Sequence, residues 1–366
     1  MKNLVSIIIL NYNNYNLTIN CLKSLNNQTY KHFEVILIDN GSDKPLYKEL
    51  KKELKNLNHN FEIQLIRSEK NLYFGAGTNK AIKIAKGDYL CLLNYDTLVE
   101  PNFIEEMVIF LENNPNAGMI TPKIYYYDNK KVIWNAGSSI DFKTPLVVKN
   151  RGLLEYDPDG TRYDKVEEIG YAPGTAMFVR REIIEEIGLI DEIYMMYYED
   201  PDWNIRAQRK GYKSYYVPTA VIYHNVPLNT IKGYKMLFWW DSEWRKKLRD
   251  KNLKIYRGSS KPDKNDKAKG PRGRNKLFMD YFFKRNTQIL VWKFAGIKDL
   301  FVFYLNYFKM IFLVIIFNPK YIDFYRLLYS IWKGFVIGVR KRTNRSCSKH
   351  ITREYHYIRN LQTKKY

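Results

Sequence analysis

Short, mostly apolar runs alternate with segments of helical periodicity along the first third of the chain. Residues 4–10, 33–38 and 89–93 form such runs, and 61–66 resembles them. Their lack of a regular apolar–polar alternation predicts strands buried on both faces of a parallel sheet. Apolar residues recur every three or four positions within 17–25, 46–57 and 78–85, which predicts helices. Strand and helix therefore alternate, as in an α/β fold with a mostly parallel sheet and right-handed crossovers.

The pattern becomes less regular beyond residue 100. It predicts helices at 102–111 and 182–187, and short strands at 117–121, 177–179 and 214–217. Residues 125–168 follow no period, and we expect them to form an irregular lobe beside the first half.

Polar residues and glycines gather where the predicted strands end. They are Asn11 to Asn14, Asp39 with Asn40, Asn71 to Asn79 with its glycines, and Asn94 with Asp96. Because ligands of open α/β sheets bind at the carboxyl ends of the strands, this clustering predicts a nucleotide site. Asp39 could accept a hydrogen bond from a base or ribose hydroxyl, and Asp96 could hold a cation that holds phosphates. Taken singly, each of these residues is also a common turn former.

A second group with chemical potential lies near residue 200, in the order Tyr-Tyr-Glu-Asp-Pro-Asp-Trp-Asn-Ile-Arg. Pro201 suits the first position of a helix, which would make Asp200 its N-cap. Asp202 could then pair with Arg206 four residues later. The adjacent carboxylates of Glu199 and Asp200, flanked by aromatic residues, equally suit a general base.

Composition narrows the class of protein. A chain of 366 residues with 45% hydrophobic content can hold two domains, or one large domain with appendages. The three cysteines are scattered without metal-type spacing, and nothing in them indicates an oxidising compartment. The N-terminal apolar run is short for a signal peptide and precedes no small-residue cleavage site, so we interpret it as the first strand of a cytosolic protein.

The net charge of +22 is unevenly distributed. Residues 232–285 hold 18 Lys or Arg against 6 Asp or Glu, more than half of the excess. Such a block predicts an anionic partner, either membrane lipid, nucleic acid or a polyanionic substrate, unless it is a solvated linker. Within it, residues 259–274 are rich in Lys, Gly, Pro and Asp, which predicts disorder.

Six motifs occur in a characteristic order. They are Ile-Ile-Leu-Asn-Tyr-Asn, Ile-Asp-Asn-Gly-Ser, Asn-Leu-Tyr-Phe-Gly-Ala-Gly-Thr-Asn, Gly-Asp-Tyr-Leu-Cys-Leu-Leu-Asn-Tyr-Asp, Tyr-Glu-Asp-Pro-Asp-Trp and a late His. In order and spacing they resemble family 2 inverting glycosyltransferases, and most of all the rhamnosyltransferase-like branch. The resemblance covers roughly residues 4–225. It implies a GT-A fold and a nucleoside-diphosphate sugar as donor.

The resemblance also implies roles for individual residues. The residues expected to bind the nucleotide sugar are Asn11, Tyr12, Asp39, Asn40, Asn79 and Asn94. Asp200 matches the catalytic base, which deprotonates the acceptor hydroxyl for in-line attack on the anomeric carbon, and Glu199 would support it.

The metal site follows from the same resemblance. Asp96 would bind a divalent metal, Mg²⁺ or Mn²⁺, as the last acid of the family's Asp-x-Asp motif. Asn94 stands where many members carry Asp, so one carboxylate is left, and Mg²⁺ needs few protein carboxylates when substrate phosphates contribute ligands. His224 matches a position that completes metal binding in some members, although a lone histidine also suits a structural role.

Two apolar-faced segments follow the basic block. Residues 300–317 are interrupted only by Asn306 and Lys309, and residues 323–335 carry a polar stripe opposite an apolar face. After a basic block, such helices predict in-plane attachment to an anionic bilayer. Packing of both helices on the catalytic domain is an alternative, and 300–317 could also be a bilayer span or a re-entrant hairpin.

These observations predict four regions: a GT-A-like glycosyltransferase domain at 1–228, a partly disordered basic linker at 229–285, membrane-associated helices at 286–345 and a basic tail at 346–366. The predicted function is metal-assisted, inverting transfer of a sugar to a hydroxyl of a lipid-linked saccharide, in polysaccharide biosynthesis at the cytoplasmic face of the membrane. One alternative is a sugar nucleotidyltransferase, which would need a Lys-containing Gly-rich loop that does not follow Leu10. Another is a non-catalytic basic protein that binds membrane or nucleic acid. Nucleic-acid binding would call for aromatic residues among the charges of 259–274, and there are none.

Overall fold

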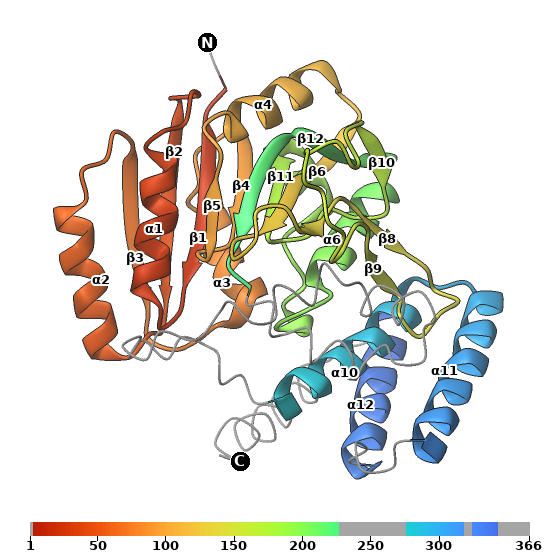
Figure 1. Cartoon of the computed structure of the whole chain (residues 1–366). Coiled ribbons are helices and arrows are strands. Elements are labelled where there is room, and N and C mark those ends of the chain that lie inside the picture. Colours follow the sequence, from red (N-terminus) through yellow and green to blue (C-terminus); the bar gives the residue numbers. More distant parts are fainter. Residues whose placement is uncertain (1–2, 227–275, 318–323, 343–366) are drawn as a thin grey trace. The chain divides into compact units, whose positions relative to one another are not determined.

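A computed structural model describes residues 3–226, 276–317 and 324–342 (Figure 1). These residues divide into two compact units. The sheet unit holds 3–139, 150–190 and 203–226, and the helical unit holds 140–149, 191–202, 276–317 and 324–342. The stretch 259–274, where we predicted disorder, and the basic tail at 346–366 lie outside the described residues.

A ten-stranded mixed sheet is the centre of the sheet unit. The strands of the described residues are β1 Val5–Asn11, β2 Phe33–Asn40, β3 Glu62–Ser68, β4 Tyr89–Leu93, β5 Thr97–Val99, β6 Ala117–Tyr126, β7 Ile133–Asn135, β8 Ser138–Ile140, β9 Val148–Asn150, β10 Glu167–Ile169, β11 Ala176–Arg180 and β12 Lys213–His224. Across the large sheet the order is β10, β12, β6, β11, β4, β1, β2 and β3, with β5 paired to β12 and β7 to β6.

The first four predicted strands are confirmed. β1 lies parallel to both β2 and β4, and β2 lies parallel to β3. The expectation of parallel crossovers fails at β11, which runs antiparallel to both of its neighbours, β4 and β6. Parallel strands need a crossover connection, usually a helix, and the described residues between β6 and β11 contain none. The sheet is mostly parallel, as predicted.

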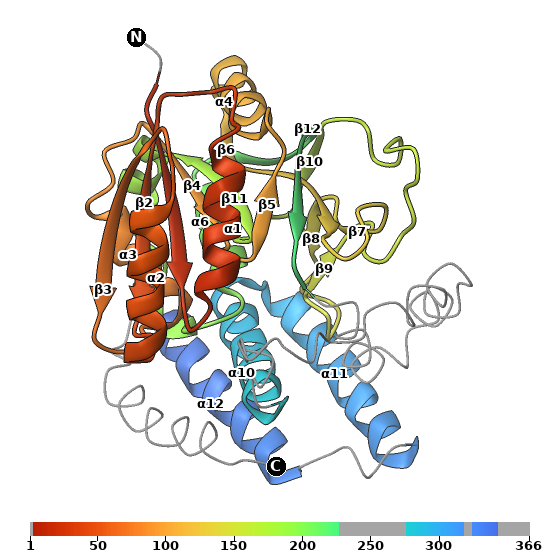
Figure 2. The same cartoon turned by 60° about the vertical axis from the view of Figure 1, so that its left-hand side comes forward.

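Alternating side chains of the buried strands contact two different layers of helices. The helices of this part are α1 Tyr15–Leu25, α2 Lys44–Asn56, α3 Tyr73–Ile82, α4 Phe103–Asn113, α5 Arg181–Ile187 and α6 Glu199–Gln208. Val5, Ile7 and Ile9 pack with side chains of α1, α2 and α4 on one face. Figure 2 shows α1 and α2 side by side on that face of the sheet. Ile8 packs with side chains of α3, α5 and the later residues of α6 on the other face. This double covering explains why the strands are continuously apolar.

Three elements differ from the sequence prediction. Helix α3 begins at Tyr73, five residues before the predicted start, because Gly75 and Gly77 lie inside the helix and not in a loop. A Cβ at Gly77 would lie 2.5 Å from Leu10 Cδ2, so this glycine allows α3 to pack closely on β1. Strand β12 is one long element with a shift in register between Val217 and Val221. The irregular lobe expected at 125–168 contains the short strands β7 to β10.

Three further helices belong to the helical unit: α10 Lys276–Phe294, α11 Ile297–Phe317 and α12 Phe324–Arg342. Helix α10 was not predicted and begins where we expected the end of a basic linker. Two glycines of α12 allow it to approach α10 closely. A Cβ at Gly334 would lie 2.2 Å from Arg285 O, and one at Gly338 would lie 2.6 Å from Trp292 Cβ.

The helical unit exposes a row of large apolar side chains. On α11 this apolar stripe consists of Ile297, Phe301, Leu305, Phe308 and Phe312, and α12 adds Leu328, Trp332 and Phe335. The members of the stripe on α11 recur every three or four residues and therefore lie on one side of the helix. Among the residues that the structure describes, no helix is both long enough and apolar enough to span a membrane.

Candidate active site

The ends of β1 and β2 form the first part of the candidate site. Asn11 lies opposite Asp39 in the parallel register and donates a hydrogen bond to Asp39 Oδ1 at 3.0 Å. It also donates to Ser42 Oγ at 3.2 Å and accepts from Thr18 Oγ1 at 2.8 Å. Asn11 is almost completely buried, so its amide holds β1 to β2 and to the start of α1. Tyr12 follows in the loop and is half-buried.

Asp39 combines full burial with unused hydrogen-bonding capacity. Its Oδ2 atom is buried and has no hydrogen-bond partner, and Arg67 Nη1 lies 3.8 Å away. Arg67 was not predicted as a site residue, although the in-register pairing of β2 with β3 places it beside Asp39. The Arg67 guanidinium lies 4.0 Å above the Tyr47 ring, which fixes its position. A buried carboxylate oxygen with free acceptor capacity suits a hydroxyl or N–H donor of a ligand.

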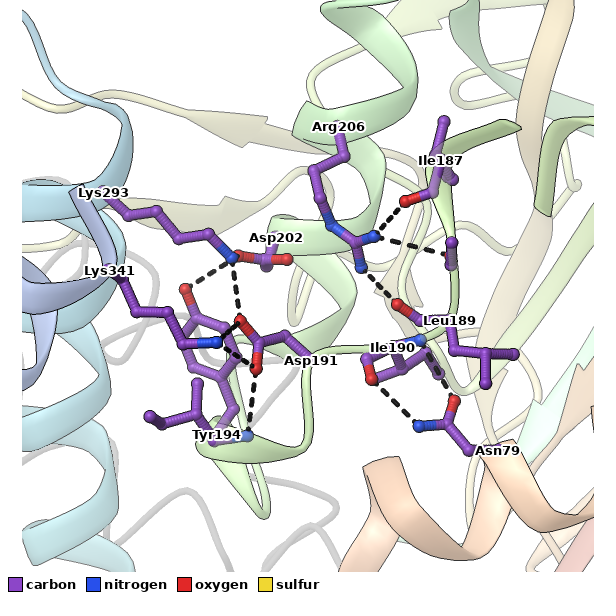
Figure 3. Close-up of polar contacts among 12 residues, drawn as sticks. Asn79, Ile187, Leu189, Ile190, Asp191, Tyr194, Asp202, Arg206, Lys293 and Lys341 are labelled. Atoms are coloured by element: carbon purple, nitrogen blue, oxygen red, sulfur yellow. Dashed lines mark hydrogen bonds and ion pairs between the residues drawn. The ribbon is translucent and has the colours of Figure 1, made fainter. Parts of the chain in front are cut away.

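Two predicted ligand-binding amides are bonded to the protein's own backbone. Asn40 accepts from Leu72 N at 2.9 Å and donates to Tyr73 O at 3.0 Å, which orders the loop before α3. Asn79 donates to Ile190 O at 2.9 Å and accepts from Ile190 N at 3.0 Å (Figure 3). The structure therefore gives both amides a structural task, and their contact with a nucleotide stays a prediction.

The candidate metal ligands meet at the ends of β4 and β12. His224 Nε2 lies 3.3 Å from Asp96 Oδ1. His224 is the last residue of β12 and Asp96 follows β4, and these two strands run in the same direction. Asp96 Oδ1 and His224 Nδ1 are buried without a hydrogen-bond partner. Trp134 of β7 packs edge-on against the His224 ring, with centroids 4.8 Å apart, and so holds the ring in place.

These two side chains fit a divalent cation that also binds a diphosphate. An imidazole nitrogen and a carboxylate oxygen suit Mn²⁺, and Mg²⁺ is commonly held by one or two carboxylates together with substrate phosphates. Among the described residues, no group of three or more His, Cys, Asp or Glu side chains could hold a metal ion. The substrate would therefore have to supply the remaining ligands. Asn94 lies two residues before Asp96, and its carbonyl accepts from Thr97 Oγ1 at 2.7 Å.

The predicted catalytic residues belong to the helical unit. Helix α6 begins at Glu199, so Asp200 is its second residue. The alternative in which Asp200 serves only as the N-cap of this helix is therefore wrong. Glu199 is buried, with Oε2 lacking a hydrogen-bond partner. Burial, together with the nearby charges of Asp200 and Asp202, raises the pKa of Glu199 well above its ordinary value. Glu199 therefore favours its neutral form, whereas Asp200 is only partly buried.

Asp202 is fully buried next to these two acids. Tyr194 donates a hydrogen bond to Asp202 Oδ1 at 2.9 Å, and Lys293 Nζ lies 2.5 Å from the same oxygen (Figure 3). Arg206, the partner predicted for Asp202, donates to the carbonyls of Ile187 and Leu189. Lys293 was not predicted as a partner of Asp202, because it lies 91 residues away in a helix that was not predicted either.

Comparisons with known proteins agree with this geometry. A model of the family described as "Glycosyl transferase family 2" matches residues 6–188, half of the chain. An uncharacterized glycosyltransferase of Methanocaldococcus jannaschii is 24% identical over 259 residues, which cover 67% of this chain and 81% of that protein. The N-acetylglucosaminyl-diphospho-decaprenol L-rhamnosyltransferase of Mycobacterium tuberculosis is 25% identical over 223 residues, 56% of this chain and 70% of that one.

A solved structure shares the fold. The crystal structure of GalNAc-T7 with UDP, GalNAc and Mn²⁺ matches with a TM-score of 0.51 and 19% identity, covering 66% of this chain and 48% of that chain. At that identity the match bears on the fold alone, which is the GT-A fold. From the family match together with this fold, the chain belongs to glycosyltransferase family 2 and is an enzyme that transfers a sugar from a nucleotide sugar.

Proposed function

We propose that this enzyme transfers a sugar, with inversion, from a nucleoside-diphosphate sugar to a hydroxyl of a lipid-linked saccharide during polysaccharide biosynthesis. The observation that supports it most is the Asp96–His224 pair, with its 3.3 Å separation and its unpartnered buried atoms, at the edge that also holds Asp39. We propose that the transferred group is a rhamnosyl group, as the name of the mycobacterial relative suggests. That name, with its diphospho-decaprenol, also motivates the lipid-linked acceptor.

The proposed donor site divides recognition between two places. Asp39 Oδ2 would accept from the ribose or base, with Asn11 and Arg67 holding the carboxylate in position. Asp96 and His224 would hold a divalent cation, which when bound neutralises charge on the leaving diphosphate. Tyr12 would border the base from the loop after β1.

Asp200 is proposed as the base that accepts the proton of the acceptor hydroxyl. Inversion requires a single in-line attack, so the acceptor oxygen has to lose its proton as it attacks the anomeric carbon. Asp200 is partly exposed, whereas its neighbour Glu199 is buried and favours its neutral form. Its partial exposure makes Asp200 the member of the pair that an acceptor hydroxyl can reach.

The first prediction concerns Asp200→Asn in the full-length enzyme. Turnover should fall by ~10² or more, the loss expected when general-base catalysis is removed. Donor affinity should stay within a few-fold, because the proposed donor ligands are unchanged. Release of nucleoside diphosphate with acceptor present measures turnover, and calorimetric titration measures donor binding. Wild-type turnover in the variant would show that Asp200 is not the base.

The second prediction concerns the raised pKa of Glu199. In the unfolded chain Glu199 releases its proton at a lower pH than in the folded protein. Stability from this group therefore falls as pH rises from the ordinary glutamate pKa through the raised value. Glu199→Gln removes that loss, so the variant should gain stability relative to wild type between about pH 5 and about pH 8. Urea midpoints at the two pH values measure the effect.

The control for Glu199→Gln is Glu185→Gln, which changes an exposed glutamate in the same way. Its midpoints should follow those of the wild type at both pH values. If the difference between Glu199→Gln and wild type were the same at both pH values, Glu199 would not carry a raised pKa.

The third prediction concerns the metal. Wild-type enzyme should bind a nucleoside diphosphate, tested with UDP, GDP and dTDP, at least about tenfold more tightly in Mn²⁺ than in EDTA, since the cation links protein to phosphate. Asp96→Ala should remove most of this difference. Asp159→Ala, at an exposed aspartate of the sheet unit, should retain it. Equal affinity of the wild type in Mn²⁺ and in EDTA would overturn the metal proposal.

The helical unit is proposed to attach the enzyme to the cytoplasmic face of an anionic membrane. The apolar stripe of α11 and the exposed apolar residues of α12 would supply the apolar contact. The basic residues of 232–285, most of which lie outside the described residues, supply the attraction to anionic lipid, worth on the order of 1 kcal/mol for each Lys or Arg near the surface. Salt weakens the second contribution and not the first.

The fourth prediction separates these two contributions. Full-length enzyme should sediment with phosphatidylcholine–phosphatidylglycerol vesicles at low salt and partly at high salt. Replacing Phe301 and Phe308 by Ser should abolish the part that survives high salt. Ile109→Ser, at an exposed apolar residue of the sheet unit, should change neither part. A full-length protein that ignores these vesicles at low salt would refute membrane attachment.

A further inference from the structure

The segment that carries Glu199 and Asp200 has an unfavourable backbone. Met195, Tyr197 and Tyr198 have φ angles of 60°, 69° and 72°, which side chains larger than glycine rarely adopt. Such a conformation is strained and persists only where its surroundings impose it. The segment therefore depends on the contacts that surrounding residues make with it.

Helix α10 supplies that support through side chains that bond to the segment's backbone. The amide nitrogen of Asn286 lies 2.9, 2.8 and 2.8 Å from the carbonyl oxygens of Tyr194, Met196 and Tyr197. Arg285 Nη1 donates to Ile193 O at 2.7 Å. One helix thus bonds four carbonyls within five consecutive residues of the segment.

Side-chain contacts continue this support to the start of α6. Thr287 donates to the Tyr198 hydroxyl at 2.8 Å, and the Tyr197 ring stacks on Phe283 with centroids 4.4 Å apart. Tyr198 directly precedes Glu199, so these contacts fix the point at which α6 begins.

Ion pairs hold both ends of the segment in a cluster of four charged residues, Asp191, Asp202, Lys293 and Lys341. Lys293 Nζ lies 3.0 Å from Asp191 and 2.5 Å from Asp202, which are eleven residues apart and enclose the strained backbone (Figure 3). Lys341 of α12 lies 2.8 Å from Asp191. Burial raises the pKa of Asp191, but the two lysines outweigh it and leave that pKa below its ordinary value.

The composition of α10 argues against a role in anchoring alone. Arg285, Asn286, Thr287 and Gln288 are four consecutive polar residues, all buried. Burying polar groups is unfavourable unless they are hydrogen-bonded, so an anchoring helix would carry apolar residues there. The first three instead bond to the segment 193–198, and Gln288 accepts from Tyr304 of α11 at 2.6 Å.

We propose that α10 positions the catalytic segment, with Asn286 and Lys293 as positioning residues that hold the strained backbone before Glu199 and Asp200. The proposal rests on the proposed role of Asp200 as the base. It assigns the C-terminal helices a part in catalysis in addition to membrane attachment. Neither residue needs to touch the substrate for this effect.

The test compares Asn286→Leu with Gln288→Leu in the full-length enzyme. Both replace a buried amide of α10 by an apolar side chain of similar size, but Asn286 hydrogen-bonds to the segment whereas Gln288 bonds to Tyr304. Hydrogen exchange of a peptide covering 192–199 should speed up at least about tenfold in Asn286→Leu and stay unchanged in Gln288→Leu. In steady-state kinetics Asn286→Leu should lose at least about tenfold in kcat, with the KM for donor within about twofold.

Lys293→Met and Lys293→Arg provide a second pair in case Asn286→Leu does not fold. The Met variant should show the same faster exchange and lower kcat, and the Arg variant, which keeps the charge between Asp191 and Asp202, should recover most of both. Unchanged exchange of 192–199 in Lys293→Met and in any folded Asn286→Leu would overturn the proposal. So would an equal loss in Gln288→Leu.

The outcome is separable from that of the proposed function. If Asp200→Asn kept wild-type turnover, Asp200 would not be the base, and faster exchange in Asn286→Leu would still show that α10 holds the segment. If Asp200→Asn were inactive and the α10 variants kept normal exchange and kcat, Asp200 would be supported as the base, and the positioning role of α10 would be refuted.

Discussion

Buried carboxylates impose the constraint on which this structure depends, because an acid removed from water must find a cation or keep its proton. Asp39 lies near Arg67, and Asp202 contacts Lys293. Glu199 has the charges of two other acids nearby, and its pKa is raised accordingly. Elements distant in the sequence supply the cations near Asp39 and Asp202. The unexpected helix α10 supplies Lys293, and β3 supplies Arg67 in register with Asp39.

The buried part of the fold was predictable from the sequence. Strand β4 spans Tyr89–Leu93 as predicted, because a run of five apolar residues between polar ends has one stable place, the middle of a sheet covered on both faces. The clustering of polar residues at the strand ends was predictable for the same reason. In the structure Asn11 lies beside Asp39, as this clustering led us to expect. The resemblance to the family singled out Asp96 and His224, and His224 Nε2 lies 3.3 Å from Asp96 Oδ1.

What the sequence could not reveal depends on contacts between distant residues. Helix α10 escaped prediction because its buried face is polar at Arg285 to Gln288 and therefore resembles a solvated linker. The early start of α3 escaped because Gly77, typical of loops, serves close packing on Leu10. The backbone hydrogen bonds of the Asn40 and Asn79 side chains were also not predicted. Each amide bonds to backbone more than 30 residues away, and no local pattern encodes such a bond.

The central claim is inverting transfer from a nucleoside-diphosphate sugar, and a donor screen with product analysis tests it most directly. Full-length enzyme with Mn²⁺ and a lipid-linked saccharide is incubated with UDP-, GDP- and dTDP-sugars. Release of nucleoside diphosphate identifies the donor, and NMR of the product gives its anomeric configuration. The account predicts acceptor-dependent release with one class of donor, and a product whose anomeric configuration is opposite to that of the donor. A product that retains the donor configuration would contradict it, as would no acceptor-dependent release from any donor.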